Sequence, residues 1–305
     1  MPLERLIRRL SGWPGRKAVK YDGRVIDIHT HIQPVSVIED RKPFVVTEPD
    51  FKILYEDPAS RLAGSEDVLE TMAGNEIDSA VILGFAWRHT ETLRMHNDEI
   101  LKASDDNPGR LLGFTCVYPF ASDPGAEAER CFRLGAAGIG EVGLYDRDLD
   151  HEYINAMQSI MRVCREWNKP LMLHVNEPVG HEYSGKAPIS IRGIYDFVKA
   201  FPDNRIILAH WGGGLFFYSS LKKEVKDLLK NVWFDSAASP YLYDGRIWRL
   251  AAELAGIDRI LFGTDFPLLS AKRYHKELET SGFTGDELER VYYKNAEDVL
   301  GMKLF

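Results

Sequence analysis

The stretch Val25-Ile26-Asp27-Ile28-His29-Thr30-His31 decides how this chain folds, because a run of β-branched residues leads directly into two histidines. The run predicts a buried strand over residues 24–29. Since side chains alternate along a strand, His29 and His31 should lie on the same side of it. Two imidazoles placed in this way can bind one metal ion, so the segment predicts both a strand and a metal site.

Seven further runs of the same kind follow, each separated from the next by a segment with helical spacing, and they cover residues 79–85, 111–119, 138–144, 170–175, 205–210, 232–236 and 260–265. Most are continuously apolar, which is typical of strands covered on both faces. Eight such units predict an α/β fold, a single (β/α)₈ TIM barrel. A doubly wound open sheet is disfavoured because no G-x-G-x-x-G turn follows the first strand.

Two segments lie outside this alternation, although the whole of residues 1–305 is expected to form one domain. Residues 32–64 make too long a connection after the first strand and contain four prolines, which is typical of a lid or binding loop. Residues 1–23 form an N-terminal extension whose first part is Arg-rich and amphipathic. We expect a short helix over one end of the fold there, with a transit peptide or a membrane-surface helix as alternatives.

The composition is that of an ordinary soluble protein. The chain has 38 Lys plus Arg against 46 Asp plus Glu, a net charge of −8, and 45% hydrophobic residues. The acidic balance argues against a nucleic-acid partner, and no apolar run approaches the length of a membrane span. Three cysteines in apolar surroundings, Cys116, Cys131 and Cys164, indicate buried thiols in a reducing compartment, so a cytoplasmic location is expected.

Polar residues gather where the predicted strands end, which is where barrel enzymes place their chemistry. Besides the histidine pair, Glu141, His174, His210 and Asp265 each end one strand. Histidines with carboxylates form the ligand set of zinc or a similar ion, and the sequence leaves open one ion or two. The other histidines fall in loops or helices and are expected at the surface or around the site.

Three longer motifs resemble the amidohydrolase superfamily, in the branch of predicted TIM-barrel metal-dependent hydrolases and aminocarboxymuconate-semialdehyde decarboxylase. They are the segments 25–31, 207–213 (Ile-Leu-Ala-His-Trp-Gly-Gly) and 261–267 (Leu-Phe-Gly-Thr-Asp-Phe-Pro). The resemblance implies that His29, His31, His174 and Asp265 hold a divalent metal and that His210 is catalytic. Glu141 departs from the decarboxylase pattern and is similar to the metal-bridging glutamate of TatD-type deoxyribonucleases, so His210 could instead bind a second ion.

The presence of Glu141 favours hydrolysis of a small ester, lactone or amide by metal-activated water. Asp265 would then accept the proton of the water, and His210 would stabilise the oxyanion. The alternative is non-oxidative decarboxylation of an aromatic or enol acid, with His210 as proton donor. Phosphodiester hydrolysis and a non-enzymatic binding role are less favoured.

Two further expectations concern what the site contacts. Arg88, after the second strand, could pair with a substrate carboxylate. The expected partner is a small molecule, with neither nucleic acid nor membrane. Clustered aromatics, namely Trp211, Phe216, Phe217 and Tyr218, would suit a homo-oligomer but are also typical of core.

Overall fold

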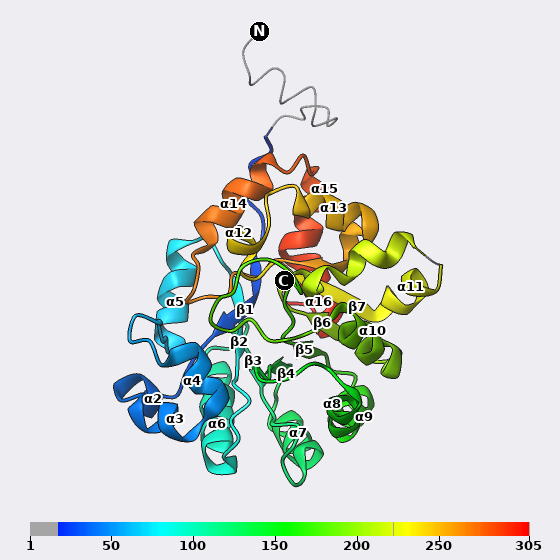
Figure 1. Ribbon diagram of the computed structural model, residues 1–305. Coiled ribbons are helices and arrows are strands. Elements are labelled where there is room, and N and C mark those ends of the chain that lie inside the picture. Colours follow the sequence, from blue (N-terminus) through cyan, green and yellow to red (C-terminus); the bar gives the residue numbers. More distant parts are fainter. Residues whose placement is uncertain (1–17, 222, 305) are drawn as a thin grey trace.

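The computed structural model describes residues 18–221 and 223–304, which form a barrel of eight parallel strands ringed by helices (Figure 1). The strands follow one another in chain order: β1 (Ile26–His31), β2 (Ser79–Leu83), β3 (Leu111–Thr115), β4 (Gly138–Val142), β5 (Leu171–Leu173), β6 (Ile206–Leu208), β7 (Val232–Asp235) and β8 (Ile260–Leu261). The barrel closes through hydrogen bonds from Ile28 N to Phe262 O (2.9 Å) and from His31 N to Phe266 O (2.7 Å). The predicted (β/α)₈ barrel is therefore confirmed.

The main helices between the strands are α5 (Ser65–Gly74), α6 (Thr90–Asp106), α7 (Pro124–Arg133), α8 (His151–Ala156), α9 (Gln158–Glu166), α10 (Ile191–Ala200), α11 (Lys223–Leu228), α12 (Ser239–Leu242), α13 (Ile247–Leu254), α14 (Ala271–Thr280), α15 (Gly285–Glu289) and α16 (Asn295–Leu300). Their starts follow sequence signals, since the Asp123 side chain caps α7 and the Thr284–Glu287 capping box opens α15. Helices α8 and α9 meet at Met157, which is the C-cap of the first and the N-cap of the second.

Apart from His31 at the end of β1, every strand residue is buried, and all strands except β1 are shorter than their apolar runs predicted. One core cluster draws side chains from β1, β2, β3, β5, β6, β7 and β8 together with α16, as the interior of a barrel does. At β8 the ladder ends at Leu261, and the backbone of Asp265 then adopts a left-handed conformation (φ 65°). The residues that follow the ladders are therefore free to present polar side chains at the barrel rim. All three cysteines are buried free thiols, as expected.

The connection after β1, residues 32–64, is termed the insertion below. It carries three short helices, α2 (Val35–Glu39), α3 (Lys42–Thr47) and α4 (Pro49–Tyr55), which lie beside α6 in Figure 1. Its main apolar anchor is Phe51 on α4, whose ring contacts Phe85 and Trp87 in the connection after β2. The insertion is thus a packed helical cover rather than an irregular loop.

The N-terminal prediction falls mostly on residues 1–17, which lie outside the described residues. Within the described part of the chain, no helix is both long enough and apolar enough to cross a bilayer.

Candidate metal and active site

The histidine pair of β1 converges as the sequence predicted. The β1–β2 register shifts between Asp27 and Thr30, a span that contains His29, and the Nε2 atoms of His29 and His31 come within 3.0 Å of each other. His29 is completely buried, and its Nδ1 lies 2.8 Å from Asp235 Oδ2 at the end of β7. A carboxylate can only accept a hydrogen bond, so this contact places the proton on Nδ1 and leaves Nε2 to face the cluster.

Asp265 reaches the same point from the other side of the barrel closure. Its amide donates to the carbonyl of His29 (2.9 Å), which fixes the turn after β8 against β1. Its Oδ1 then lies 3.5 Å from His29 Nε2 and 3.3 Å from His31 Nε2. Burial alone would raise the pKa of Asp265, but a hydrogen bond from His31 and the charge of His29 outweigh it and lower the pKa to about 2. The carboxylate is therefore ionised at any physiological pH.

Glu141 lies at an irregularity of β4, between Ile139 and Val142, where the register with β5 shifts. Gly140 allows this approach: its φ is 151°, and a Cβ there would lie 2.7 Å from Met172 Cβ. Oε2 of Glu141 faces the β1 pair, at 3.8 Å from His29 and 3.6 Å from His31. The side chain is 6% exposed and therefore sits inside the histidine cluster.

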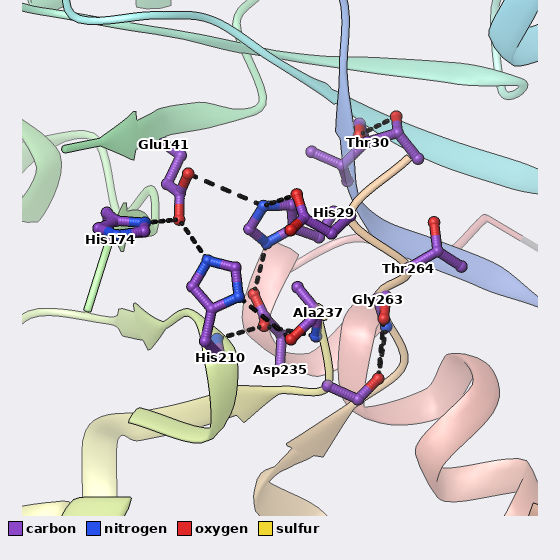
Figure 2. A network of polar contacts seen from close by, with 12 residues as sticks. His29, Thr30, Glu141, His174, His210, Asp235, Ala237, Gly263 and Thr264 are labelled. Atoms are coloured by element: carbon purple, nitrogen blue, oxygen red, sulfur yellow. Dashed lines mark hydrogen bonds and ion pairs between the residues drawn. The ribbon is translucent and has the colours of Figure 1, made fainter. Parts of the chain in front are cut away.

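The other oxygen of Glu141 faces a second pair of histidines, as Figure 2 shows. Oε1 lies 3.0 Å from His174 Nδ1 and 3.4 Å from His210 Nε2. The pKa of Glu141 is well below its usual value, because the histidines outweigh the effect of burial. No Lys or Arg of the described chain forms an ion pair with Glu141, so its charged neighbours there are histidines.

His210 is aimed at Glu141 by an unusual turn after β6. From His210 to Gly214 every φ is positive, and at Gly213 (φ 58°) a Cβ would lie 2.5 Å from the Asn176 carbonyl oxygen. The His-Trp-Gly-Gly-Gly motif is thus a backbone requirement. His210 Nδ1 lies 3.1 Å from the Ala237 carbonyl, while Nε2 faces Glu141. Burial lowers the pKa of His210, but Glu141 and Asp265 raise it to about 9.

Two overlapping groups in the described residues have ligand atoms close enough to share one ion. They are His29 with His31 and Asp265, and His29 with Glu141 and His210. His174 belongs to neither group: its Nδ1 contacts Glu141, and its Nε2 lies 3.2 Å from the Gly185 carbonyl. Of the predicted ligands, the structure therefore brings four together, and the direct ligation by His174 stays a prediction. His29, His31, Glu141, His174, His210 and Asp265 are termed the strand-end cluster below.

Two buried aspartates support the strand-end cluster. Asp27 accepts from the amide of His29 (3.1 Å) and from the Thr264 hydroxyl (2.6 Å), so it ties β1 to the turn after β8, in line with a structural role. Asp235 was missed. Besides His29, it accepts from the amides of His210 (2.9 Å) and Ala237 (3.0 Å). Its position at the end of a buried run, level with the other strand-end residues, was the available signal.

Arg88 lies elsewhere than expected. Its Nε donates to Asp50 Oδ2 (2.9 Å), and one terminal guanidinium nitrogen pairs with Asp146 (3.0 Å); Arg88 does not line the cavity. The amides of Arg88 and His89 donate to Glu48 at 2.9 and 3.1 Å. These five residues, termed the clasp below, fasten the insertion to the connections after β2 and β4.

A cavity of about 340 Å³ opens above the strand-end cluster. His31, Glu141, His174, His210 and Asp265 form its floor, and its walls include the apolar side chains of Leu54, Tyr55, Phe85, Tyr145, Pro267 and Leu268. This volume is at the small end of the range for ligand sites. The insertion therefore contributes a wall to a pocket whose floor comes from the barrel.

Known proteins share this architecture. The amidohydrolase family model Amidohydro_2 matches residues 26–302, so the chain belongs to the amidohydrolase family. Decarboxylase orsB of Emericella nidulans is 26% identical to it over 262 residues, which cover 69% of this chain and 76% of that protein.

Solved structures of two decarboxylases have the same fold. 5-Carboxyvanillate decarboxylase LigW from Sphingomonas paucimobilis superposes with a TM-score of 0.72 at 16% identity, covering 92% of this chain and 99% of that one. Dihydroxybenzoic acid decarboxylase from Polaromonas sp. JS666, solved with bound manganese and the inhibitor 2-nitroresorcinol, gives 0.67 at 19% identity, covering 92% and 97%.

The prediction of a hydrolase is wrong in the light of these relatives, which are decarboxylases. The resemblance to the amidohydrolase superfamily itself is confirmed. The error came from Glu141, which was interpreted as a group that bridges metals for water activation. In the structure this carboxylate contacts four histidines, and that arrangement does not require a hydrolytic reaction.

Proposed function

We propose that this protein is a metal-dependent decarboxylase that removes the carboxylate of a small aromatic acid as carbon dioxide, without an oxidant. The observation that carries the proposal is that decarboxylase orsB, the relative whose match covers 69% of the chain, is a decarboxylase. The geometry of the strand-end cluster supports it, because the cluster can hold a cation beside a histidine that can donate a proton.

We infer that His29, His31 and Asp265 hold a divalent ion, with Glu141 as the adjoining oxygen donor. Donors about 2.0–2.2 Å from one ion, at tetrahedral or octahedral angles, lie roughly 2.8–3.6 Å apart. The distances among these three residues, 3.0, 3.3 and 3.5 Å, fall in that range. Two imidazoles with a carboxylate suit zinc, the ion expected from sequence, and also manganese, which the Polaromonas enzyme binds.

Decarboxylation breaks the bond between the carboxylate carbon and the ring, leaves the electron pair on the ring carbon and requires one proton there. When bound, the ion would act as a Lewis acid on substrate oxygens. His210 lines the cavity, and its Nε2 faces a carboxylate that can only accept, so this nitrogen carries a proton. We assign His210 as the donor to the ring carbon. Asp265, with its low pKa, suits holding the cation rather than giving up a proton.

The size and walls of the cavity suit a single aromatic ring. Tyr145 and Phe85 offer ring faces and edges, while the carboxylate end of the substrate would point to the histidine floor. A small-molecule substrate fits this site. The absence of a nucleic-acid or membrane partner, a cytoplasmic location and a homo-oligomer remain predictions.

The test is to load the purified protein with manganese or zinc and supply 2,6-dihydroxybenzoate and 5-carboxyvanillate. We expect carbon dioxide release, and in deuterium oxide one deuterium on the ring carbon of the product. His210→Gln should abolish release and keep the metal, whereas His151→Gln, a histidine on the exposed start of α8, should change neither. Hydrolysis of esters or lactones with no decarboxylation of either acid would refute the proposal.

A further inference from the structure

Three connections meet over His174. The ring of Tyr145, after β4, lies 4.8 Å from the His174 ring between centroids. The carbonyl of Gly185, after β5, lies 3.2 Å from His174 Nε2. Leu54 of α4 lies so close to Gly185 that a Cβ there would be 2.7 Å from its Cδ2. The wall of the cavity above the histidine is therefore built by segments that are far apart in the sequence.

One buried carboxylate joins two of these segments to the connection after β2. Asp50, at the start of α4, is 2% exposed. Its Oδ1 accepts the backbone amide of Tyr145 at 3.1 Å. Its Oδ2 accepts Nε of Arg88 at 2.9 Å and the terminal guanidinium nitrogen at 2.8 Å. Both oxygens are thus occupied by donors from outside the insertion.

The replacement of this carboxylate would leave donors without partners. The Arg88 guanidinium stays charged, and its remaining partner Asp146 is half exposed, so it does not substitute for a buried ion pair. In Asp50→Asn one acceptor oxygen remains, and the charged Arg88 guanidinium binds it more strongly than a neutral amide does. The NH₂ group then faces the partly buried amide of Tyr145, which loses its acceptor, and this costs more than the bond itself contributes. The backbone amide that loses its acceptor belongs to Tyr145, whose ring packs on His174.

We propose that Asp50 is a positioning residue of the active site: it holds the Tyr145 backbone so that the Tyr145 ring packs on His174, and it thereby fixes the wall against which the substrate lies. Asp50 does not line the cavity and acts only through Tyr145. The part of this inference that concerns substrate rests on the proposed function. The part that concerns the position of Tyr145 does not.

The substrate arm is a double-mutant cycle on the manganese-loaded enzyme with 2,6-dihydroxybenzoate. Asp50→Asn should raise KM at least about fivefold, because a charged buried hydrogen bond is lost, while kcat changes less than about twofold and metal content is unchanged. In a Tyr145→Leu background, Asp50→Asn should add little, since the ring through which it acts is already gone. Effects on KM that multiply in the double variant would overturn the proposal. Asp50→Glu should restore part of the wild-type KM.

The second arm is hydrogen–deuterium exchange, which needs no substrate. Asp50→Asn should speed exchange in peptides covering residues 143–149 and leave β1 protected. Unchanged exchange at Tyr145 would also overturn the proposal. Asp106→Asn, which breaks an exposed pair with Lys102 on α6, is the matched control and should alter neither arm. If Asp50→Asn fails to fold, Arg88→Lys replaces it in the same double-mutant cycle, since lysine lacks the planar guanidinium whose two nitrogens contact Asp50.

If the wild-type enzyme turns over neither aromatic acid, the proposed function fails, and the exchange arm alone decides the role of Asp50. If turnover occurs but neither KM nor exchange responds to the substitution, the proposed function stands and this inference fails. The two outcomes are therefore separable.

Discussion

The strand-end cluster and the clasp are built from the same kinds of side chain but have different roles. Both bury carboxylates almost completely, Glu141 in the cluster and Glu48 and Asp50 in the clasp. In the clasp both oxygens of Glu48 and both oxygens of Asp50 accept N–H groups of Arg88, His89 or Tyr145. In the cluster the carboxylates face imidazoles.

The difference lies in which groups are left without a suitable partner. In the clasp the buried carboxylates have N–H donors for both oxygens, from the always-charged Arg88 guanidinium at Asp50 and from backbone amides at Glu48 and Asp50. In the cluster two imidazole nitrogens face each other at 3.0 Å with carboxylates on either side. Burial lowers the pKa of His29, but Asp235 and Glu141 raise it to about 10, so the cluster attracts positive charge, a proton or a metal ion. The paired carboxylates of the clasp stabilise the fold, whereas a strongly shifted pKa such as that of His29 is typical of a binding or catalytic site.

The largest effect should come from removing a nitrogen of the strand-end cluster. His31→Ala takes away one of three proposed ligands and opens the site to water. We expect loss of bound metal and a fall in decarboxylation of more than about 100-fold, beyond what supporting residues usually cause. Element-resolved metal analysis and carbon dioxide release measure both. Full metal occupancy in His31→Ala and in His29→Ala would show that the ligand assignment is wrong.

Glu141→Gln should have the next largest effect. The amide keeps the shape but loses the negative charge that faces four histidines, so metal affinity or turnover should fall by at least about tenfold. Metal titration by calorimetry, with turnover on the same samples, distinguishes the two routes. A variant that keeps both would mean that the cluster does not need this charge, and the contrast with the clasp would disappear.

The barrel and the strand-end cluster could be predicted because both depend on local sequence patterns. Each strand is an apolar run, and several runs carry a polar residue near their end, such as Glu141 or Asp265, at the same rim. Parallel strands bring such ends together without any knowledge of long-range contacts. The convergence of His29 and His31 follows from this rule, even though the register shift next to them does not.

The clasp could not be predicted, since its contacts have no periodicity. Arg88 looked like a substrate-binding cation because nothing in the sequence connects it to Asp50, 38 residues earlier, or to Asp146, 58 residues later. Asp235 was overlooked because it ends a strand without a neighbouring histidine in the sequence. The reaction was misjudged for another reason: metal ligands of one type serve both hydrolysis and decarboxylation, so the ligands alone do not choose between them.

Glu48→Gln tests whether the clasp stabilises the fold without affecting the metal site. Glu48 accepts from the Arg88 amide, the His89 amide and His89 Nδ1. A glutamine must turn its NH₂ group toward one of these donors, so the free energy of unfolding should fall by about 1–3 kcal/mol. Metal content should stay the same. Denaturant unfolding with metal analysis tests this, and Glu166→Gln, in an exposed pair with Arg162, should cost less than about 1 kcal/mol. Metal loss in Glu48→Gln would mean that the two networks are coupled.

The smallest effect concerns His96, which lies next to the clasp and is 1% exposed. The indole of Trp87 donates to its Nδ1 at 2.9 Å. Burial lowers the pKa of His96 from 6.5 to about 3. Between these values the unfolded chain binds a proton that the folded chain does not, so the protein loses stability as pH falls below about 6.5.

His96→Gln keeps an acceptor for the Trp87 indole but has no proton to gain. On lowering the pH from 7 to 5, the wild type should lose about 1–2 kcal/mol more unfolding free energy than the variant. Urea unfolding of both proteins at pH 7, 6 and 5 measures the difference, and the strand-end cluster, common to both, cancels from it. Parallel pH profiles would show that His96 binds its proton equally well in the folded state. In that case burial beside the clasp would not exclude charge, and the contrast would rest on the carboxylates alone.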